Sequence, residues 1–434
     1  MRLIATSLVL ALVTGACSGA VSIETTEAPD TSSVPGVLIA SNVGRADPDA
    51  EPSDVATVAS GMRAFAVDLY GRLASGEGNL VFSPVSVYVA LAMTYGGAVG
   101  LTADEMAEVL GIDLSADEFH AAMNVLEQAI ESRNRAATEH EGAVEVSIAN
   151  SLWGQDGMTF EEVFLDLLAL DYGAGMRLVD FTDPTAREEA RIAINDWVAG
   201  ETNERIEDLI QDGVLDETVR LLLVNAVYLN AAWLTPFDEA STADRSFTLL
   251  DGSDLLVPTM HSSGTLLQGR GDGWQAVQVP YAGRELAMVV ILPDAGYFEH
   301  VEASLSSGLI DSVLGSLSSA QVNLSLPKFE IRTQAGLVPA LQAMGLSEAT
   351  GPSADFSGMT GAKDLFISDV VHEAWISADE AGTEAAAATA VIMSLTAVPM
   401  DPISIDCDRP FLFVLYDAET GSILFMGRVV DPSA

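Results

Sequence analysis

Basic charge is scarce in this chain. Its 434 residues include 19 lysines and arginines against 63 acidic residues, which gives a formal net charge of −44, and the only lysines are Lys328 and Lys363. No basic run is present to neutralise phosphates, so nucleic acids and anionic membrane surfaces are not expected partners. The acidic residues are spread along the whole chain, which favours solubility in a salty habitat over one specific cationic partner.

Histidine and cysteine are also rare, and the common catalytic motifs are missing. The five histidines have no metal-ligand spacing, and the sequence lacks the GxGxxG, Walker, HExxH, GxSxG and CxxC patterns. We therefore expect no metal, no cofactor and no enzymatic activity. Cys407 lies between Asp406 and Asp408, whose charges raise a thiol pKa, so a structural thiol is favoured over a nucleophile.

The first 17 residues have the layout of an export signal. An apolar stretch over residues 3–13 is too short to span a membrane and is followed by small residues that end at Cys17. Small residues before a cysteine also resemble a bacterial lipoprotein cleavage box, so either Cys17 is lipidated or the signal is simply removed. We expect a protein that is secreted or tethered to the cell surface by an N-terminal lipid. In either case no disulfide forms in the mature chain.

Periodicity then divides the chain into a linker and one folded domain. Residues 18–54 are rich in Ser, Thr, Pro, Ala and acids and predict a flexible linker, and residues 55–434 predict the domain. Apolar residues at helical spacing predict a helix near its start: Val58, Met62, Phe65, Ala66, Leu69 and Leu73. Strand-like alternation or buried apolar runs occur at residues 144–148, 220–229, 286–292 and 322–326. Helices dominate the first half and strands the second, which indicates an α+β fold with mainly antiparallel or mixed sheets.

Two capping boxes predict helix starts within the first half. Thr102 pairs with Glu105, and Ser115 with Glu118, at the spacing that caps a first turn.

One segment near the C-terminus has an unusual composition. Residues 380–390 are almost entirely small, and β-branched residues and Pro399 follow. An alanine-rich helix is one interpretation. A strand is the other, because residues 365–377 before it are strand-like and small side chains do not obstruct insertion into a packed sheet.

This segment resembles the hinge of inhibitory serpins, and the resemblance extends from about residue 55 to residue 432. Further blocks match the family in order and spacing: residues 79–86, 97–102, 195–198, 202–203, 223–228, 236–237, 326–329, 410–413 and 425–430. The resemblance implies a serpin fold of three sheets surrounded by about nine helices, with an exposed reactive-centre loop. It also implies an inhibitor that forms a covalent complex with a target protease, after which the cleaved loop inserts into the main sheet.

The resemblance assigns residues to three working regions. The hinge comprises Glu380, Gly382, Thr383, Glu384, Ala385, Ala386, Ala387, Ala388 and Thr389. The shutter, a buried polar group where the sheet parts, comprises Ser83, Ser86, Asn225 and His372, for which satisfied core residues are the alternative. The breach, at the top of the sheet, comprises Trp233, Lys328 and Glu380.

The reactive bond and its partner follow from the hinge spacing. Counting from Gly382 places the bond at Thr396–Ala397, with Leu395 one residue away, whereas local similarity to an elastase inhibitor would place it after Met400. The loop up to residue 410 is a few residues longer than in common family members, which leaves this register open. Because all the candidates are uncharged, the expected targets are elastase-, subtilisin- or chymotrypsin-like serine proteases, with cysteine proteases a further option.

The sequence also departs from some family members. Residues 113–131, which match the polysaccharide-binding helix of activated serpins, contain no Lys or Arg, so heparin-type activation is not expected. We expect a monomer. A non-inhibitory serpin that binds or carries a partner is the main alternative, and a surface hydrolase is a more distant one.

Overall fold

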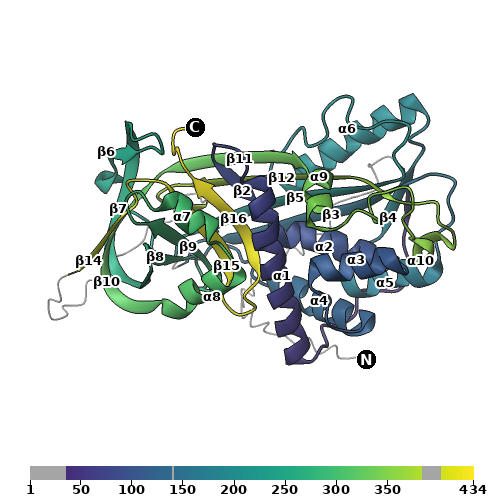
Figure 1. Cartoon of the computed structure of the whole chain (residues 1–434), viewed down its shortest axis with the longest axis horizontal. Coiled ribbons are helices and arrows are strands. Elements are labelled where there is room, and N and C mark those ends of the chain that lie inside the picture. Colours follow the sequence, from purple (N-terminus) through teal and green to yellow (C-terminus); the bar gives the residue numbers. More distant parts are fainter. Residues whose placement is uncertain (1–35, 139–140, 384–401) are drawn as a thin grey trace, which may run out of the picture. The chain divides into compact units, whose positions relative to one another are not determined.

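The computed structural model describes residues 36–138, 141–383 and 402–434 (Figure 1). These residues belong to one compact unit that starts at Val34. Within these ranges, no helix has both the length and the apolar character needed to cross a membrane.

The main sheet has seven strands, in the order β1 (Val37–Ile39), β4 (Met176–Val179), β3 (Val144–Gln155), β5 (Leu221–Ala232), β13 (Gly382–Thr383), β12 (Ile367–Ala378) and β11 (Phe329–Gly336). β5 and β12 pair in parallel from Leu221 to Val227 of β5, and β13 lies between the two strands farther along, opposite Ala231 and Ala232. The central strands therefore touch directly at one end and are separated by the short β13 at the other.

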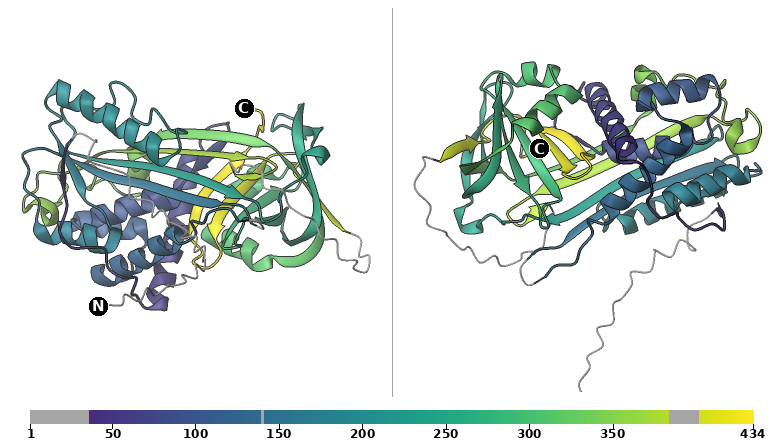
Figure 2. Two further views of the ribbon diagram at one scale, coloured as in Figure 1. Left: turned by 180° about the vertical axis from the view of Figure 1, so that it is seen from behind. Right: turned by 90° about the horizontal axis from the view of Figure 1, so that it is seen from below.

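β5 is apolar except at Asn225, Tyr228 and Asn230, because both faces of the main sheet are covered. Leu221 and Leu223 belong to the larger core, whereas Leu222 and Val224 belong to a second core beneath α6 (Pro184–Glu201). The helices α2 (Pro84–Tyr95), α3 (Leu101–Leu110), α4 (Ala116–Glu131) and α5 (Glu162–Tyr172) lie on the face opposite α6 (Figure 2). A strand buried on both faces reads as a continuous apolar run, as the sequence predicted.

The remaining strands form a nine-stranded sheet in which β7 (Asp254–Gly271) has two sets of neighbours. β6 (Ala243–Thr248) pairs with the first residues of β7, and β8 (Trp274–Pro280) with its last five. The sheet path is β14 (Ile403–Asp406), β10 (Ser318–Pro327), β7, β8, β9 (Leu286–Pro293), β15 (Phe411–Asp417), β16 (Ile423–Val429) and β2 (Leu80–Phe82). If the nine-stranded sheet is divided into two at β7, these two and the main sheet make three sheets, as in the expected α+β fold.

The described residues contain ten α-helices. The others are α1 (Pro52–Leu73), α7 (Phe298–Ala303), α8 (Ser307–Ser316), α9 (Val338–Met344) and the single turn α10 (Ser357–Thr360). α1 buries the predicted face, and Ser115 and Glu118 form the predicted capping box of α4.

The second predicted capping box is wrong. α3 begins at Leu101, after Gly100 with a φ of 59°. The Thr102 hydroxyl instead accepts a hydrogen bond from the Asp355 backbone (2.8 Å), and the Glu105 carboxylate accepts one from the Glu348 backbone (2.7 Å). Both side chains hold a distant segment rather than a helix end.

The linker prediction also needs correction for residues 36–54. β1 pairs with β4, the Ala46 carbonyl accepts hydrogen bonds from Asn124 and Gln128 of α4, and α1 begins at Pro52. The segment is ordered because its polar groups bond to α4 and to the sheet edge, partners about 80 or more residues away in sequence that local composition does not reveal. Residues 18–35 and the predicted signal lie outside the described residues.

Candidate functional site

The described hinge residues are Glu380, Gly382 and Thr383, and the last two form β13, which lies between two strands. Gly382 pairs with Ala232 of β5, and Thr383 pairs with Ala231 on one side and Ala378 of β12 on the other. A Cβ atom at position 382 would overlap the Ala231 carbonyl oxygen and lie 2.7 Å from Cα of Ala232. Only glycine therefore fits where the hinge enters the sheet.

The Thr383 side chain is fully buried and has a specific partner. Its hydroxyl lies 2.6 Å from the hydroxyl of Tyr281, whose ring stacks on Trp233 with centroids 4.5 Å apart. Burial raises the pKa of Tyr281, so this phenol stays neutral and hydrogen-bonded. Thr383 therefore lies beside the stacked rings of Tyr281 and Trp233 at the end of β5.

A tight turn connects β12 to the short β13 beside these two rings. The Asp379 carboxylate accepts hydrogen bonds from the backbone N–H groups of Ala381 (2.8 Å) and Gly382 (3.2 Å). The indole of Trp233 donates to the Asp379 carbonyl (2.8 Å), and the Trp233 backbone donates to the Ala381 carbonyl (2.9 Å). These bonds fix the direction in which the chain leaves β12.

The breach residues come together beside this turn. The Lys328 ammonium lies 2.7 Å from Glu380 Oε2, and Thr242 donates to Glu380 Oε1 (2.8 Å). Burial raises the Glu380 pKa, but the hydrogen bonds from Lys328 and Thr242 outweigh it and hold this pKa below its ordinary value. The Lys328 side chain is 39% exposed, so the pair is worth at most about 1 kcal/mol.

The shutter residues form two hydrogen-bonded pairs on either side of Asn225. The Ser83 backbone donates to His372 Nε2 (3.1 Å), and the Ser86 hydroxyl donates to Asn150 Oδ1 (2.7 Å). In the sheet register Asn150, Asn225 and His372 stand in one row across β3, β5 and β12.

Asn225 is the unsatisfied member of this row. Both polar atoms of its side chain, and Nδ1 of His372, are buried with no hydrogen-bond partner among the described residues. Burial lowers the pKa of His372 to about 3, so the ring is neutral at physiological pH. The β5–β12 contact therefore holds buried hydrogen-bonding groups without partners among the described residues.

Four residues of these regions were not identified from the sequence: Asn150, Thr242, Tyr281 and Asp379. Asn150 could have been found, because it occupies the next inward position after the alternating Val144, Val146 and Ile148. Asp379 also had a local signal, because an aspartate just before Gly382 is typical of a turn in which the carboxylate accepts backbone hydrogen bonds two and three residues later. Thr242 and Tyr281 depend on contacts between distant segments and carry no local signal.

Several predicted residues lie outside the described residues. These are the hinge residues Glu384, Ala385, Ala386, Ala387, Ala388 and Thr389, the reactive-bond candidates Leu395, Thr396, Ala397 and Met400, and the lipidation candidate Cys17.

Cys407 is buried, and its pKa is raised mainly by burial, with smaller effects from Asp408 and Asp406. The described ranges hold no group of three or more side chains placed to bind a metal ion.

Comparisons with known proteins agree with this geometry. Residues 60–432 match the family model described as serpin (serine protease inhibitor). An uncharacterized serpin-like protein of Thermococcus kodakarensis is 38% identical over 86% of each chain, and rat leukocyte elastase inhibitor A is 33% identical over 85% of this chain and 97% of its own.

Solved structures show the same fold. The thermophilic serpin tengpin in its native state superposes with a TM-score of 0.79 at 27% identity, covering 92% of this chain and all of tengpin. Human thyroxine-binding globulin complexed with thyroxine gives a TM-score of 0.74 at 30% identity, covering 87% and 99%. The chain therefore belongs to the serpin family.

Proposed function

We propose that this serpin inhibits serine endopeptidases by a suicide-substrate mechanism. Serpins are generally protease inhibitors rather than catalysts. The observation that supports inhibition here is β13, because the first residues of the small-residue segment already occupy the space between β5 and β12. A strand that has begun to form there needs only a free end to extend.

The chemistry belongs to the target protease. Its catalytic serine attacks a loop carbonyl, the peptide bond breaks, and the N-terminal part remains as an acyl ester on the serine. The C-terminal part gains a new amino terminus and stays bound to the protein through β14, β15 and β16. The freed segment then extends β13 down the sheet and separates the parallel β5–β12 pair. Movement of the attached protease distorts its active site before water hydrolyses the ester.

The proposed targets are elastase-, subtilisin- or chymotrypsin-like enzymes, with cleavage at Thr396–Ala397. Mass spectrometry of the peptide released on denaturing the complex tests the bond. A peptide that begins at Ala397 or Thr396 supports the hinge count, and one that begins at Asp401 overturns it.

A protease panel tests inhibition itself. Incubation with elastase, subtilisin and chymotrypsin should give an adduct that survives denaturing electrophoresis, with trypsin as the control that gives little. A non-inhibitory serpin, as the similarity to thyroxine-binding globulin allows, would be cut without forming an adduct. A hydrolase would show neither result.

We further propose that the protein is exported, either secreted or tethered by a lipid on Cys17. Residues 1–17 support this through their signal-like layout. Metabolic labelling with a fatty-acid probe, compared between wild type and Cys17→Ala, separates the two forms.

A further inference from the structure

A surface hollow of about 570 Å³ lies between α7, the turn that joins β6 to β7, and residues 430–431 near the C-terminus. At one side of it, Arg428 of β16 lies 2.7 Å from Glu302 of α7 (Figure 1). A second hollow of about 400 Å³ adjoins the first and continues to Pro410 before β15. The two hollows have four lining residues in common: Leu249, Leu250, Phe298 and Glu299. Together they form the α7 groove, and each is within the size range of ligand-binding pockets.

The floor of the α7 groove is apolar and partly exposed. Phe298 and Val430 pack into the core, whereas Leu250, in the turn between β6 and β7, is 50% exposed. Pro293 and Pro410 line the second hollow. Accessible apolar side chains in a concave surface gain free energy when an apolar group of a ligand covers them. The floor therefore favours a ligand with a bulky apolar group.

Both arginines that line the α7 groove already have partners. Arg428 pairs with Glu302 and also donates to two backbone carbonyls in the chain after α1. Arg409 pairs with Asp408 at 2.6 Å and donates to the Pro293 carbonyl (2.8 Å). Each guanidinium therefore balances one carboxylate of the groove.

The groove also has carboxylates that no basic side chain balances. Among the described residues, five of its lining carboxylates have no basic side chain within ion-pair distance: Glu77, Asp251, Asp294, Glu299 and Asp431. Glu299, in the first turn of α7, is shared by the two hollows. Surplus negative charge around an apolar floor favours a cationic ligand and repels an anionic one.

We infer that the α7 groove binds a basic peptide segment in which a bulky apolar side chain stands between arginine or lysine residues. The apolar side chain would cover Phe298 and Leu250, and the basic side chains would lie near Glu299 and Glu77. An extended chain suits two adjoining hollows better than a small cation does, because a small cation leaves much of the apolar floor in water. No residue of the main sheet lines the groove, so this inference goes beyond protease trapping and does not depend on it.

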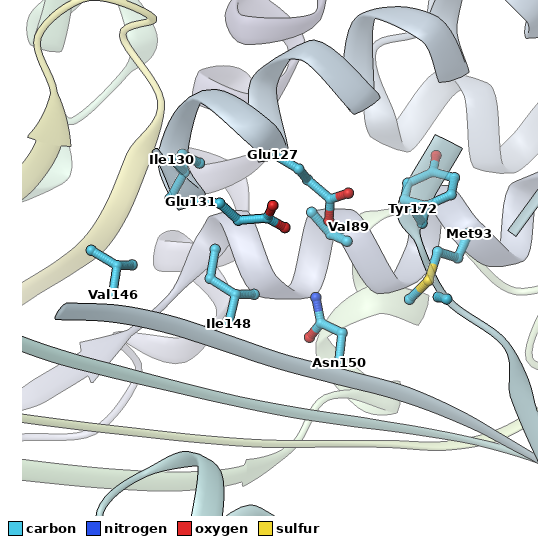
Figure 3. A pocket seen from close by; sticks show the side chains of 10 residues that line it. Val89, Met93, Glu127, Ile130, Glu131, Val146, Ile148, Asn150 and Tyr172 are labelled. Carbon is cyan, nitrogen blue, oxygen red and sulfur yellow. The ribbon is translucent and has the colours of Figure 1, made fainter. Parts of the chain in front are cut away.

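The cavity between α4 and β3 is less suited to a cationic ligand (Figure 3). It holds about 110 Å³, and its carboxylates, Glu127 and Glu131, are both paired with Arg45. The α7 groove differs in its larger volume and in its carboxylates without a basic partner in the part of the chain that the structure describes.

Isothermal titration of the intact protein with the peptide acetyl-Arg-Leu-Arg-Phe-Arg-amide tests the inference. We expect saturable binding that weakens as the salt concentration is raised, because salt screens exposed charges. Two control peptides should not bind saturably: acetyl-Arg-Ser-Arg-Ser-Arg-amide lacks the apolar side chains, and acetyl-Glu-Leu-Glu-Phe-Glu-amide reverses the charge. No saturable binding of the first peptide, or equal binding of either control, would overturn the inference.

Matched variants locate the site, and every substituted side chain is exposed, so the variants should fold. Glu77→Gln combined with Glu299→Gln should weaken binding about tenfold, at about threefold for each exposed ion pair. Leu250→Ser should weaken binding about fivefold, because it removes apolar surface that the peptide covers. Asp113→Asn combined with Glu162→Gln removes two exposed charges outside the groove and should leave the affinity nearly unchanged. Equal losses in the two double variants would show that the peptide responds only to the general field of the protein, and either this result or unchanged binding by Leu250→Ser would overturn the site.

Discussion

Thr383→Arg is the substitution that most directly probes hinge insertion. The wild-type side chain is fully buried between β5 and β12 and bonds to the hydroxyl of Tyr281. An arginine at this position would place a charge beside Trp233 and Tyr281, where Glu380 is already paired with Lys328. The native protein can avoid this cost by leaving β13 unpaired, but the fully inserted form cannot.

The size of the effect follows from the buried environment. An uncompensated buried charge costs about 3–5 kcal/mol, and loss of the partner of the Tyr281 hydroxyl adds about 1–3 kcal/mol. If about 3 kcal/mol of the total is felt in the transition state for insertion, the insertion rate falls about 100-fold. Thr383→Val is the matched control, because it keeps the shape and removes only the hydrogen bond.

The assay is the stoichiometry of inhibition together with adduct formation on denaturing gels. Wild type should trap close to one protease per molecule, Thr383→Val slightly less, and Thr383→Arg should be cleaved and released. Retention of wild-type stoichiometry by the arginine variant would show that position 383 does not enter the sheet.

Three further predictions concern stability. Cleavage of the loop should raise the thermal midpoint, because the freed segment becomes a paired central strand; an unchanged or lower midpoint after limited proteolysis would count against insertion. Burial lowers the pKa of His372 to about 3, so as the pH falls the unfolded chain binds a proton at this histidine before the folded chain does. The free energy of unfolding should therefore be unaffected by this group above about pH 6.5 and should fall by about 1.4 kcal/mol per pH unit between that pH and pH 3. His372→Asn should flatten that slope in urea unfolding, and an unaltered slope would contradict the assignment. Lys328→Met should cost at most about 1 kcal/mol at neutral pH. Its cost should vanish at low pH, where Glu380 with its lowered pKa becomes protonated, so a cost that persists there would argue against the ion pair.

Much of the fold was predictable because its signals are local. The apolar spacing of α1, the near-continuous apolar run of β5 and the capping box of α4 are each patterns of residues close together in sequence. Features that join distant segments were not predictable. Thr102 resembles a helix cap when only its neighbours in sequence are considered, but its hydroxyl accepts a hydrogen bond from the backbone of Asp355, 253 residues later.

The same contrast holds for the candidate site. The family resemblance placed Lys328 near Glu380, and the structure puts them 2.7 Å apart. The resemblance did not suggest that Thr383 would bond to Tyr281. Nothing in the sequence around Tyr281 distinguishes it from other tyrosines near buried strands, and only the folded structure stacks it on Trp233. Residue types and spacing indicate which groups matter, but their buried partners are set by tertiary packing.

β1 has a consequence for how copies of this protein meet. Its three residues cover the outer edge of β4, from Val37 opposite Leu178 to Ile39 opposite Met176. An uncovered strand edge is a template for pairing with another chain, and short covering strands are one way that proteins prevent aggregation. Proteolytic trimming of the chain before residue 40 would uncover β4, so a truncated form should self-associate at concentrations where the intact protein does not.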